Sequence, residues 1–507
     1  MKKYKKIIAC IVLLPFLFIM GCTDLDEDVY SQMPVDQYGQ TMPEVNSLIA
    51  PIYTGLRKAN NPIMLEETSS NMSIVPTMKG GDGWEGGIYK ELRYGTWTAQ
   101  NSCIRKFYNV CFSEISNCNS ILYMIESSEA ITDKVPYTSQ IRAVRAYWYY
   151  KLVDLFGNVP IVTDFTDVSK PVTKTRKDVY QFIISELNDI KDIIRADVST
   201  SSYGKFTKGA VYTLLAKMYL NAMVWDPSEG AKWQECIDAC NVVLDMPYSL
   251  EPVWKDNFIT DNEDCKETIL TAVNSTVSGN SIVFMTLHYL DPIALGLKIG
   301  GWNGEVAQPN YVDSFDILDK RYNGSFLIGP MIDPATGEVL ITAHGRPLIH
   351  GTDFTMKYNI DADGWGQCDQ EVGARCYKWE FKNGLSSALE NDCAIFRLAD
   401  IYLMKAEALV RMGGDNVKAT NLVNDIRKRA FTDPAKLKTN VTLADIYSER
   451  RFEFAWESMT RQDEIRFGTF LDPIPGWRAA IPAKCLIFPI PQISIDANPG
   501  LVQNSGY

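Results

Sequence analysis

The segment RAVRAYWYYKLVDLFGNVP, residues 142–160, predicts an amphipathic helix with a defined end. Apolar side chains recur along it at steps of three, four or multiples of these, namely Ile141, Val144, Trp148, Leu152, Leu155 and Phe156. Gly157 and Pro160 follow, which is typical of the end of a helix. We therefore expect a helix that buries one apolar face and then turns sharply.

Two helical hairpins are predicted further along the chain. The first joins a helix over 209–222 to a partner over 233–240 through a turn at Asp226-Pro227. The second joins 398–409 to 419–426 through a glycine-containing turn at 411–415. Such hairpins resemble tetratricopeptide repeats, whose period is about 34 residues and whose faces are buried by stacking on neighbours. The alternative is a pair of ordinary hairpins inside a globular protein.

Residues 251–391, which we call the excursion, differ in composition from the helical parts. They are rich in Gly, Asn, Asp and Thr, with short apolar runs such as 268–273 and a turn at Asp333-Pro-Ala-Thr-Gly337. Long irregular segments on a compact scaffold tend to carry function. The predicted fold class is therefore all-α, with tetratricopeptide-like hairpins as a scaffold and a loop-rich excursion that carries a few short strands.

The N-terminus predicts export and lipid anchoring. Four lysines within the first six residues precede an apolar run over 7–20, which is shorter than the ~20 residues of a membrane-spanning helix. Ile19-Met20-Gly21-Cys22 resembles the bacterial lipobox, so Cys22 is the expected lipid anchor to the membrane. The acidic run 24–28 resembles the export signal of surface lipoproteins. The alternative is an ordinary secreted protein with an incidental cysteine.

The predicted organisation has four parts: a lipoprotein signal peptide at 1–21, an N-terminal helical part at 22–250, the excursion at 251–391 and a C-terminal helical part at 392–507. We expect 22–507 to form one compact unit.

Charge and motifs exclude several classes of function. The net charge of −12 becomes −16 when 1–21 and its four lysines are removed, which makes nucleic acid an improbable partner and suits a neutral ligand. We predict no cofactor and no metal, because Cys-x-x-Cys spacing is absent and the three histidines form no paired zinc motif. Asp361-Ala-Asp363-Gly364 is closer to a surface turn than to a calcium loop. Among the ten cysteines outside the signal peptide and anchor, Cys368 and Cys376 are the first pair to test for a disulfide.

Three carboxylates, Glu449, Glu453 and Glu457, are spaced to share one helical face. Two nearby carboxylates could suggest a glycosidase. We instead expect an ion-pair network, because paired charges lower the pKa of a carboxylic acid and a general acid needs a raised one. The expected partners are Arg450, Arg451, Arg461 and Arg466.

Five ordered blocks of this sequence resemble the SusD/RagB family. They lie at 142–160, 209–220, 396–408, 449–468 and 488–507, and together they span nearly the whole chain. The resemblance implies a helical outer-membrane protein with tetratricopeptide-like units. It also implies a partner, a SusC-like TonB-dependent barrel over which such a protein sits as a lid.

A glycan site should combine exposed aromatic rings with polar groups on loops. Glycine-rich surroundings leave a ring open, and this criterion selects Trp84, Tyr89, Tyr289, Trp302, Asn303 and Trp365. No family motif fixes these positions, and local packing is the alternative for each ring.

The sequence therefore predicts a lipid-anchored binding protein for an oligosaccharide, without catalysis. Three alternatives remain: the same fold binding peptides or protein fragments, a surface glycoside hydrolase, and a repeat scaffold that binds only protein.

Overall fold

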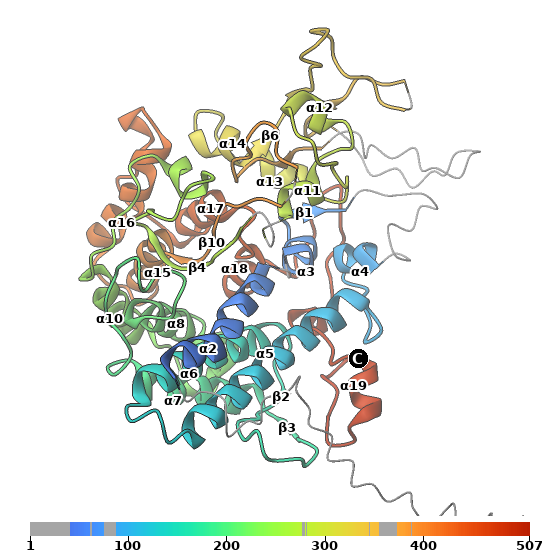
Figure 1. The fold of residues 1–507 in the computed structure, drawn as a ribbon. Helices are drawn as coiled ribbons and strands as arrows, with labels where there is room; N and C mark the ends of the chain where they lie inside the picture. Colours follow the sequence, from blue (N-terminus) through green and yellow to red (C-terminus); the bar gives the residue numbers. More distant parts are fainter. Residues whose placement is uncertain are drawn as a thin grey trace, which may run out of the picture.

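The computed structural model describes residues 41–60, 63–75, 88–275, 279, 281–343, 345–353, 373–386 and 388–507. About 49% of the chain is helical, and the described strands are short and pair two by two (Figure 1). The prediction of an all-α fold with a few short strands is confirmed. Among these residues, no helix combines the length and hydrophobicity that spanning a bilayer requires.

The helices before the excursion are α2 (Met42–Gly55), α3 (Ile63–Ser69), α4 (Ile88–Tyr94), α5 (Ser102–Ser127), α6 (Val135–Leu155), α7 (Arg176–Ile190), α8 (Lys208–Leu220), α9 (Ala222–Trp225) and α10 (Trp233–Leu244). Those after it are α15 (Leu398–Arg411), α16 (Asn416–Ala430), α17 (Leu443–Phe454), α18 (Thr460–Phe467) and α19 (Gln492–Ala497). Short 3-10 turns lie at Leu56–Asn60, Pro227–Glu229, Trp254–Phe258, Pro434–Lys436 and Ala483–Leu486.

Helix α6 contains the predicted helical segment and ends where the sequence indicated. The Phe156 N–H donates to the Leu152 carbonyl, and Gly157 follows with a φ of 69°. The expectation of a single buried face is wrong, however, because every residue of α6 from Ser139 to Leu155 except Arg142 is buried, and the helix packs against α5 and α7. Its buried charges are paired across the fold: Arg145 with Glu186, and Lys151 with Glu66 on α3.

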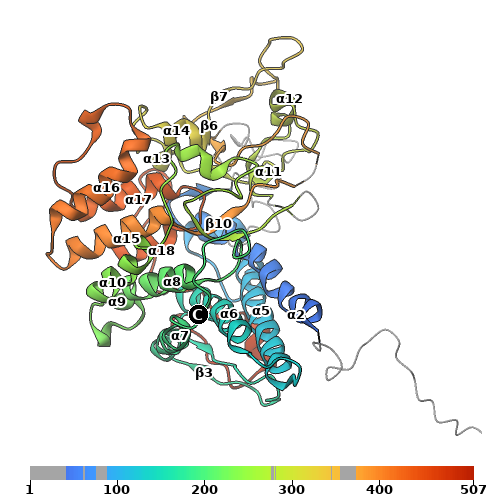
Figure 2. The same ribbon diagram turned by 60° about the vertical axis from the view of Figure 1, so that its left-hand side comes forward.

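Both predicted hairpins form and stack on each other. Helices α8 and α10 make the first, α15 and α16 make the second, and α10 packs against α15. In Figure 2 the four helices follow one another from α8 at the centre to α16 at the left. Ala406 and Ala419 are fully buried, which lets α15 and α16 approach closely. One large hydrophobic core joins helices from before and after the excursion. The predicted boundaries of the excursion at 250 and 391 stay predictions.

The excursion forms the upper part of the molecule in Figure 1. Its helices are α11 (Ile282–Thr286), α12 (Asp291–Leu295), α13 (Pro309–Val312) and α14 (Lys320–Ser325). The antiparallel strand pairs are β1 (Ser73–Ile74) with β5 (Val306–Ala307), β2 (Val159–Pro160) with β3 (Thr173–Lys174), β4 (Thr268–Ala272) with β10 (Cys393–Arg397), β6 (Phe326–Leu327) with β9 (Arg375–Cys376), and β7 (Gly329–Pro330) with β8 (Ile349–His350). The predicted turn is present, because the Gly337 N–H donates to the Asp333 carbonyl at 2.8 Å.

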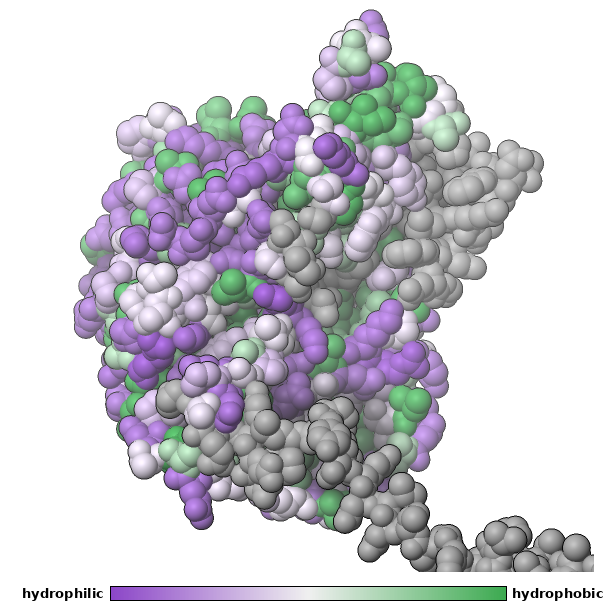
Figure 3. All heavy atoms as spheres, viewed as in Figure 1, coloured by the Kyte–Doolittle hydropathy of each residue, from purple (hydrophilic) through white to green (hydrophobic). Residues whose placement is uncertain are grey.

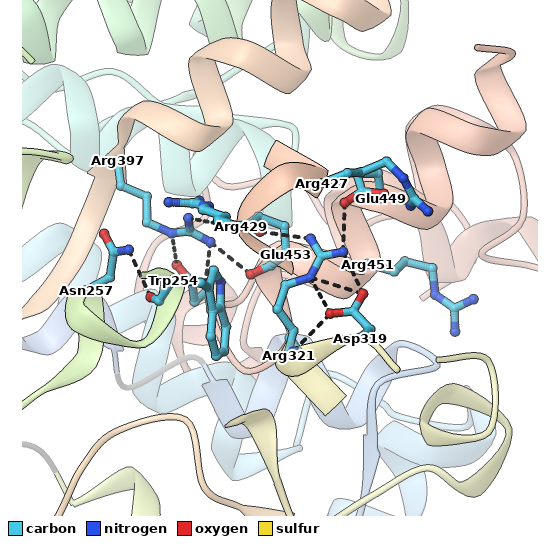
Figure 4. Close-up of polar contacts among 12 residues, drawn as sticks. Trp254, Asn257, Asp319, Arg321, Arg397, Arg427, Arg429, Glu449, Arg451 and Glu453 are labelled. Atoms are coloured by element: carbon cyan, nitrogen blue, oxygen red, sulfur yellow. Dashed lines mark hydrogen bonds and ion pairs between the residues drawn. The ribbon is translucent and has the colours of Figure 1, made fainter. Parts of the chain in front are cut away.

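A buried ion network joins the excursion to helix α17 (Figure 4). Arg321 of α14 contacts Glu449 at 2.7 Å and Glu453 at 2.9 Å. Arg397 and Arg429 each reach Glu453 at 2.6 Å. Burial alone would raise the pKa of Glu453, but these guanidinium groups hold it well below its usual range. A carboxylate stabilised in this way is a poor general acid.

The network confirms ion pairing but corrects its details. Helix α17 ends at Phe454 and Trp456 has a φ of 67°, so Glu457 leaves the face shared by Glu449 and Glu453. Glu457 pairs with Lys378 and Arg397 instead. The arginines predicted as partners have other contacts. Arg450 binds Asp400 and Asp463, Arg466 binds Glu407 and Asp463, Arg461 donates to backbone carbonyls, and Arg451 stacks on Tyr311.

Candidate ligand-binding site

Several residues predicted from the sequence lie outside the described residues: Cys22, Trp84, Trp365 and the Asp361–Asp363 turn. Cys368 does too, while its suggested partner Cys376 is a buried free thiol. Tyr89 is described and does not present an open ring. It lies on α4 with 7% of its surface exposed and packs in the main core, so its selection as a ligand contact is corrected.

Tyr289 and Trp302 are exposed on neighbouring loops of the excursion. Their exposed fractions are 51% and 46%, and Ile293 on α12 is similarly open at 46%. Figure 3 shows hydrophobic residues gathered at the upper edge of the molecule, in the region of α12. Exposed aromatic and aliphatic side chains on loops are typical of a binding surface. We call these three residues the Tyr289–Trp302 surface.

Backbone hydrogen bonds hold the two loops side by side. The Trp302 N–H donates to the Phe284 carbonyl at 2.7 Å, and the Asn303 N–H donates to the Leu287 carbonyl at 2.8 Å. Gly301 makes this approach possible. A Cβ there would lie 2.3 Å from the Leu287 carbonyl oxygen, which is closer than any side chain allows.

A network of buried polar side chains also holds these two loops in place. Arg375 on β9 donates through Nη1 to the Asn303 Oδ1 at 2.8 Å and to the Thr286 carbonyl at 2.9 Å. His350 on β8 contacts Asp291 of α12 at 2.7 Å through Nε2. Asp291 also accepts the His288 N–H at 2.6 Å. These side chains are buried, so the network holds the backbone of the loops that carry Tyr289 and Trp302.

The histidines in this network are neutral. Burial, together with the charge of nearby Arg375, lowers the pKa of His288 to about 4. Burial also lowers the pKa of His350. The hydrogen bonds agree with one tautomer of His350, in which Nδ1 accepts from Arg375 Nε at 3.4 Å and Nε2–H donates to Asp291. Neutral His350 therefore links a guanidinium to a carboxylate without adding charge.

Asn303 supports the surface and does not form part of it. It is 1% exposed, its φ is 52°, and its side-chain oxygen accepts from Arg375. Asparagine tolerates this left-handed backbone better than most residues. The prediction of Asn303 as a direct contact is therefore corrected to a positioning role.

The arrangement suits binding by stacking on open rings. In the part of the chain that the structure describes, no group of three or more His, Cys, Asp or Glu side chains could hold a metal ion. The rigid elements below the loops pre-organise the rings, which lowers the entropy cost of binding. The sequence pointed to Tyr289 and Trp302 through their aromatic character and the nearby glycines. It gave no sign of Asp291, His350 or Arg375, which come together only in the fold.

Comparison with known proteins agrees with this architecture. Residues 369–479 match the profile described as "SusD family". Residues 25–220 match the profile described as "Starch-binding associating with outer membrane". The starch-binding protein SusD of Bacteroides thetaiotaomicron is 27% identical over 429 residues, which cover 76% of each chain.

Solved structures share the fold at low sequence identity. A SusD superfamily protein from Parabacteroides distasonis superposes with a TM-score of 0.75 at 21% identity, over 91% of this chain and 99% of its own. Surface glycan-binding protein A from Bacteroides thetaiotaomicron, in complex with laminarihexaose, gives a TM-score of 0.72 at 18% identity, over 91% and 99%.

Stacked helical hairpins that carry a loop-rich excursion with exposed aromatic rings define a class of helical repeat-like proteins. Within that class, the chain belongs to the SusD-like family.

Proposed function

We propose that this chain is a lipid-anchored glycan-binding protein of the outer membrane, which holds an oligosaccharide on the Tyr289–Trp302 surface and delivers it to a SusC-like TonB-dependent transporter. The observation that carries the proposal is the pair of exposed rings on loops fixed by buried Arg375. Sugar rings present C–H faces that stack on aromatic side chains, and a rigid pair of rings favours such stacking.

The family supports the class of ligand. One relative is named a starch-binding protein, and one solved relative is in complex with laminarihexaose. The acidic net charge of the chain suits a neutral glycan better than an anionic one. The proposal includes no catalytic step, because the paired carboxylates of α17 are buried among arginines.

The contribution of Trp302 can be calculated from its exposure. A tryptophan offers roughly 150–250 Å² when fully covered, and 46% of Trp302 is open. Covering roughly 80 Å² of it at ~25 cal/mol/Å² gives about 2 kcal/mol. Trp302→Ala should therefore weaken glycan binding roughly 30-fold, since 1.4 kcal/mol corresponds to about tenfold.

The test begins with a screen of soluble polysaccharides by affinity electrophoresis, using the chain from residue 23 onward. Calorimetry on the retained glycan then compares Trp302→Ala and Tyr289→Ala with Tyr123→Ala. Tyr123 is a matched control, because it is 42% exposed on α5, remote from the excursion. Unchanged affinity in both site variants would refute this surface as the site. Retention of peptides and no glycan would refute the ligand class.

The anchor and the partner have separate tests. Cys22→Ala should release the protein from the outer membrane and abolish incorporation of labelled palmitate. The full-length chain should co-purify with a TonB-dependent barrel from detergent-solubilised membranes. A soluble wild-type protein without labelled palmitate would refute the lipid anchor. Isolation of the protein without any barrel would refute the transporter as its partner.

A further inference from the structure

A cavity lies away from the Tyr289–Trp302 surface. It measures about 390 Å³ and is bounded by strand β4, the loop over 198–207 and the turn over 263–268. Figure 1 places β4 and α8 at the middle and lower left of the molecule, whereas α12 is at the upper right. The volume is near the lower end of the ~300–1,000 Å³ range of small-molecule sites. The volume therefore suits a small ligand such as a single ring.

Hydroxyl groups and two tyrosine rings share the lining of this cavity with aliphatic side chains such as Ile269 and Val273. Tyr203 and Tyr248 are half-buried in it, and serine and threonine side chains from all three bounding segments add hydroxyls. The Tyr203 hydroxyl donates to Asp392 at 2.6 Å, so that carboxylate already has a partner. Aromatic faces beside several hydroxyls match the mixed C–H and O–H surface of a sugar ring.

One hydroxyl in the lining is buried without a hydrogen-bond partner. Thr271 on β4 is 1% exposed, and its Oγ1 has no partner in the part of the chain described here. Buried polar atoms are nearly always paired, because leaving one unpaired costs about 1–3 kcal/mol. An unpaired hydroxyl lining a cavity is therefore evidence for a polar occupant.

The N-terminus of helix α8 contributes a further hydroxyl-bearing side chain to the same cavity. Thr207 is the N-cap residue of this 13-residue helix, yet its side chain makes no capping hydrogen bond. It lies against Tyr248, whose ring also covers Gly209 in the first turn. The exposed rim carries Glu263, Asp264 and Lys266, so the entrance is mildly acidic and disfavours an anion. These features favour a neutral ligand over an ion.

We propose that this cavity is a second binding site, for one neutral, hydroxyl-rich ring of monosaccharide size, with Thr271 as a polar contact. The site is independent of the Tyr289–Trp302 surface. A single free sugar or the terminal residue of a longer chain has the required chemistry.

Cys265 provides a reporter inside the cavity. It is a half-buried free thiol that lines the site, and Cys103 is a half-buried cysteine on α5, outside the cavity. The assay measures the rate of alkylation of each cysteine by iodoacetamide, peptide by peptide, in the chain from residue 23 onward. The probes are glucose, galactose, mannose and N-acetylglucosamine at equal concentration. At least one should slow the labelling of Cys265 several-fold and leave Cys103 unchanged.

Thr271→Val is the decisive variant, because it replaces the unpaired hydroxyl with a methyl of similar size. It should fold with unchanged or raised stability, since no hydrogen bond is lost in the free protein. It should also abolish the protection of Cys265. Tyr248→Phe supplies a second variant with less change to the β4 strand, and it should reduce the protection.

Three results would overturn this second site. They are the absence of protection by all four sugars, equal protection in Thr271→Val, and equal slowing at Cys103. Trp302→Ala separates the two proposals. Protection of Cys265 should persist in that variant even if glycan binding at the first surface is lost, and its disappearance there would overturn the independence of the cavity.

Discussion

Gly301→Ala should disconnect the loop of Trp302 from the loop of Tyr289. The added Cβ would lie 2.3 Å from the Leu287 carbonyl oxygen and 2.5 Å from that of His288. Both obstacles are backbone atoms, so no side chain can rotate away, and the loop itself must move by about 1 Å. That movement stretches the two backbone hydrogen bonds donated by Trp302 and Asn303.

The size of the effect follows from those contacts. Each hydrogen bond contributes about 1 kcal/mol, and overpacking a well-filled site costs about 1–3 kcal/mol. We expect a loss of about 2–3 kcal/mol in the free energy of unfolding. Glycan affinity should fall at least tenfold, because the two rings no longer share one fixed geometry.

Gly300→Ala is the matched control, one residue away. Within the described residues, nothing lies within 4 Å of an ideal Cβ at Gly300. Urea denaturation followed by far-ultraviolet circular dichroism measures stability, and calorimetry with the retained glycan measures affinity. If Gly301→Ala and Gly300→Ala behave alike in both assays, the proposed role of the close approach at Gly301 is refuted.

Two further predictions concern the buried network. Arg375→Met should lower the free energy of unfolding by about 4 kcal/mol, because it leaves Asn303 and Asp291 without their buried cation. Hydrogen exchange should also rise in peptides over 287–305. As a control, the surface change Arg195→Met should cost less than about 1 kcal/mol. The pKa of His288 is lowered to about 4 in the folded protein, so below pH ~6.5 the unfolded chain binds protons more readily than the folded chain does. The free energy of unfolding should therefore fall by up to about 3 kcal/mol as the pH drops from ~6.5 towards 4. His288→Asn should flatten that part of the urea-midpoint curve, and an identical curve would contradict the assignment.

Periodic sequence was sufficient to predict the scaffold. The apolar steps in 142–160 and the two hairpins correspond to α6, α8 with α10, and α15 with α16. The complete burial of α6 was beyond this method, because the partners of Arg145 and Lys151 lie on other helices. The i, i+8 spacing of Glu449 and Glu457 misled for a local reason, since the helix ends at Phe454.

The candidate site was predictable only in its exposed part. Tyr289 and Trp302 stand out in the sequence because glycines and polar residues surround them. The supporting residues do not, because Asp291 and His350 are 59 positions apart and meet through the pairing of short strands. Tyr89 also follows a glycine-rich stretch, but its helix directs it into the core. Burial of this kind depends on packing partners that are distant in the chain.

The ion network of α17 also sets an order of events during synthesis. Glu267 and Arg429 are 162 positions apart, and Arg321 and Glu453 are 132 apart. A chain that emerges N-terminus first carries Glu267 well before Arg429 exists, and it carries Arg321, which pairs with Asp319, well before Glu453 exists. Burying Glu267 without Arg397 and Arg429 costs several kcal/mol, so this part of the excursion closes only after those arginines have emerged. Contacts this distant also slow folding, which makes Tyr289 and Trp302 among the last parts of the molecule to reach their final positions.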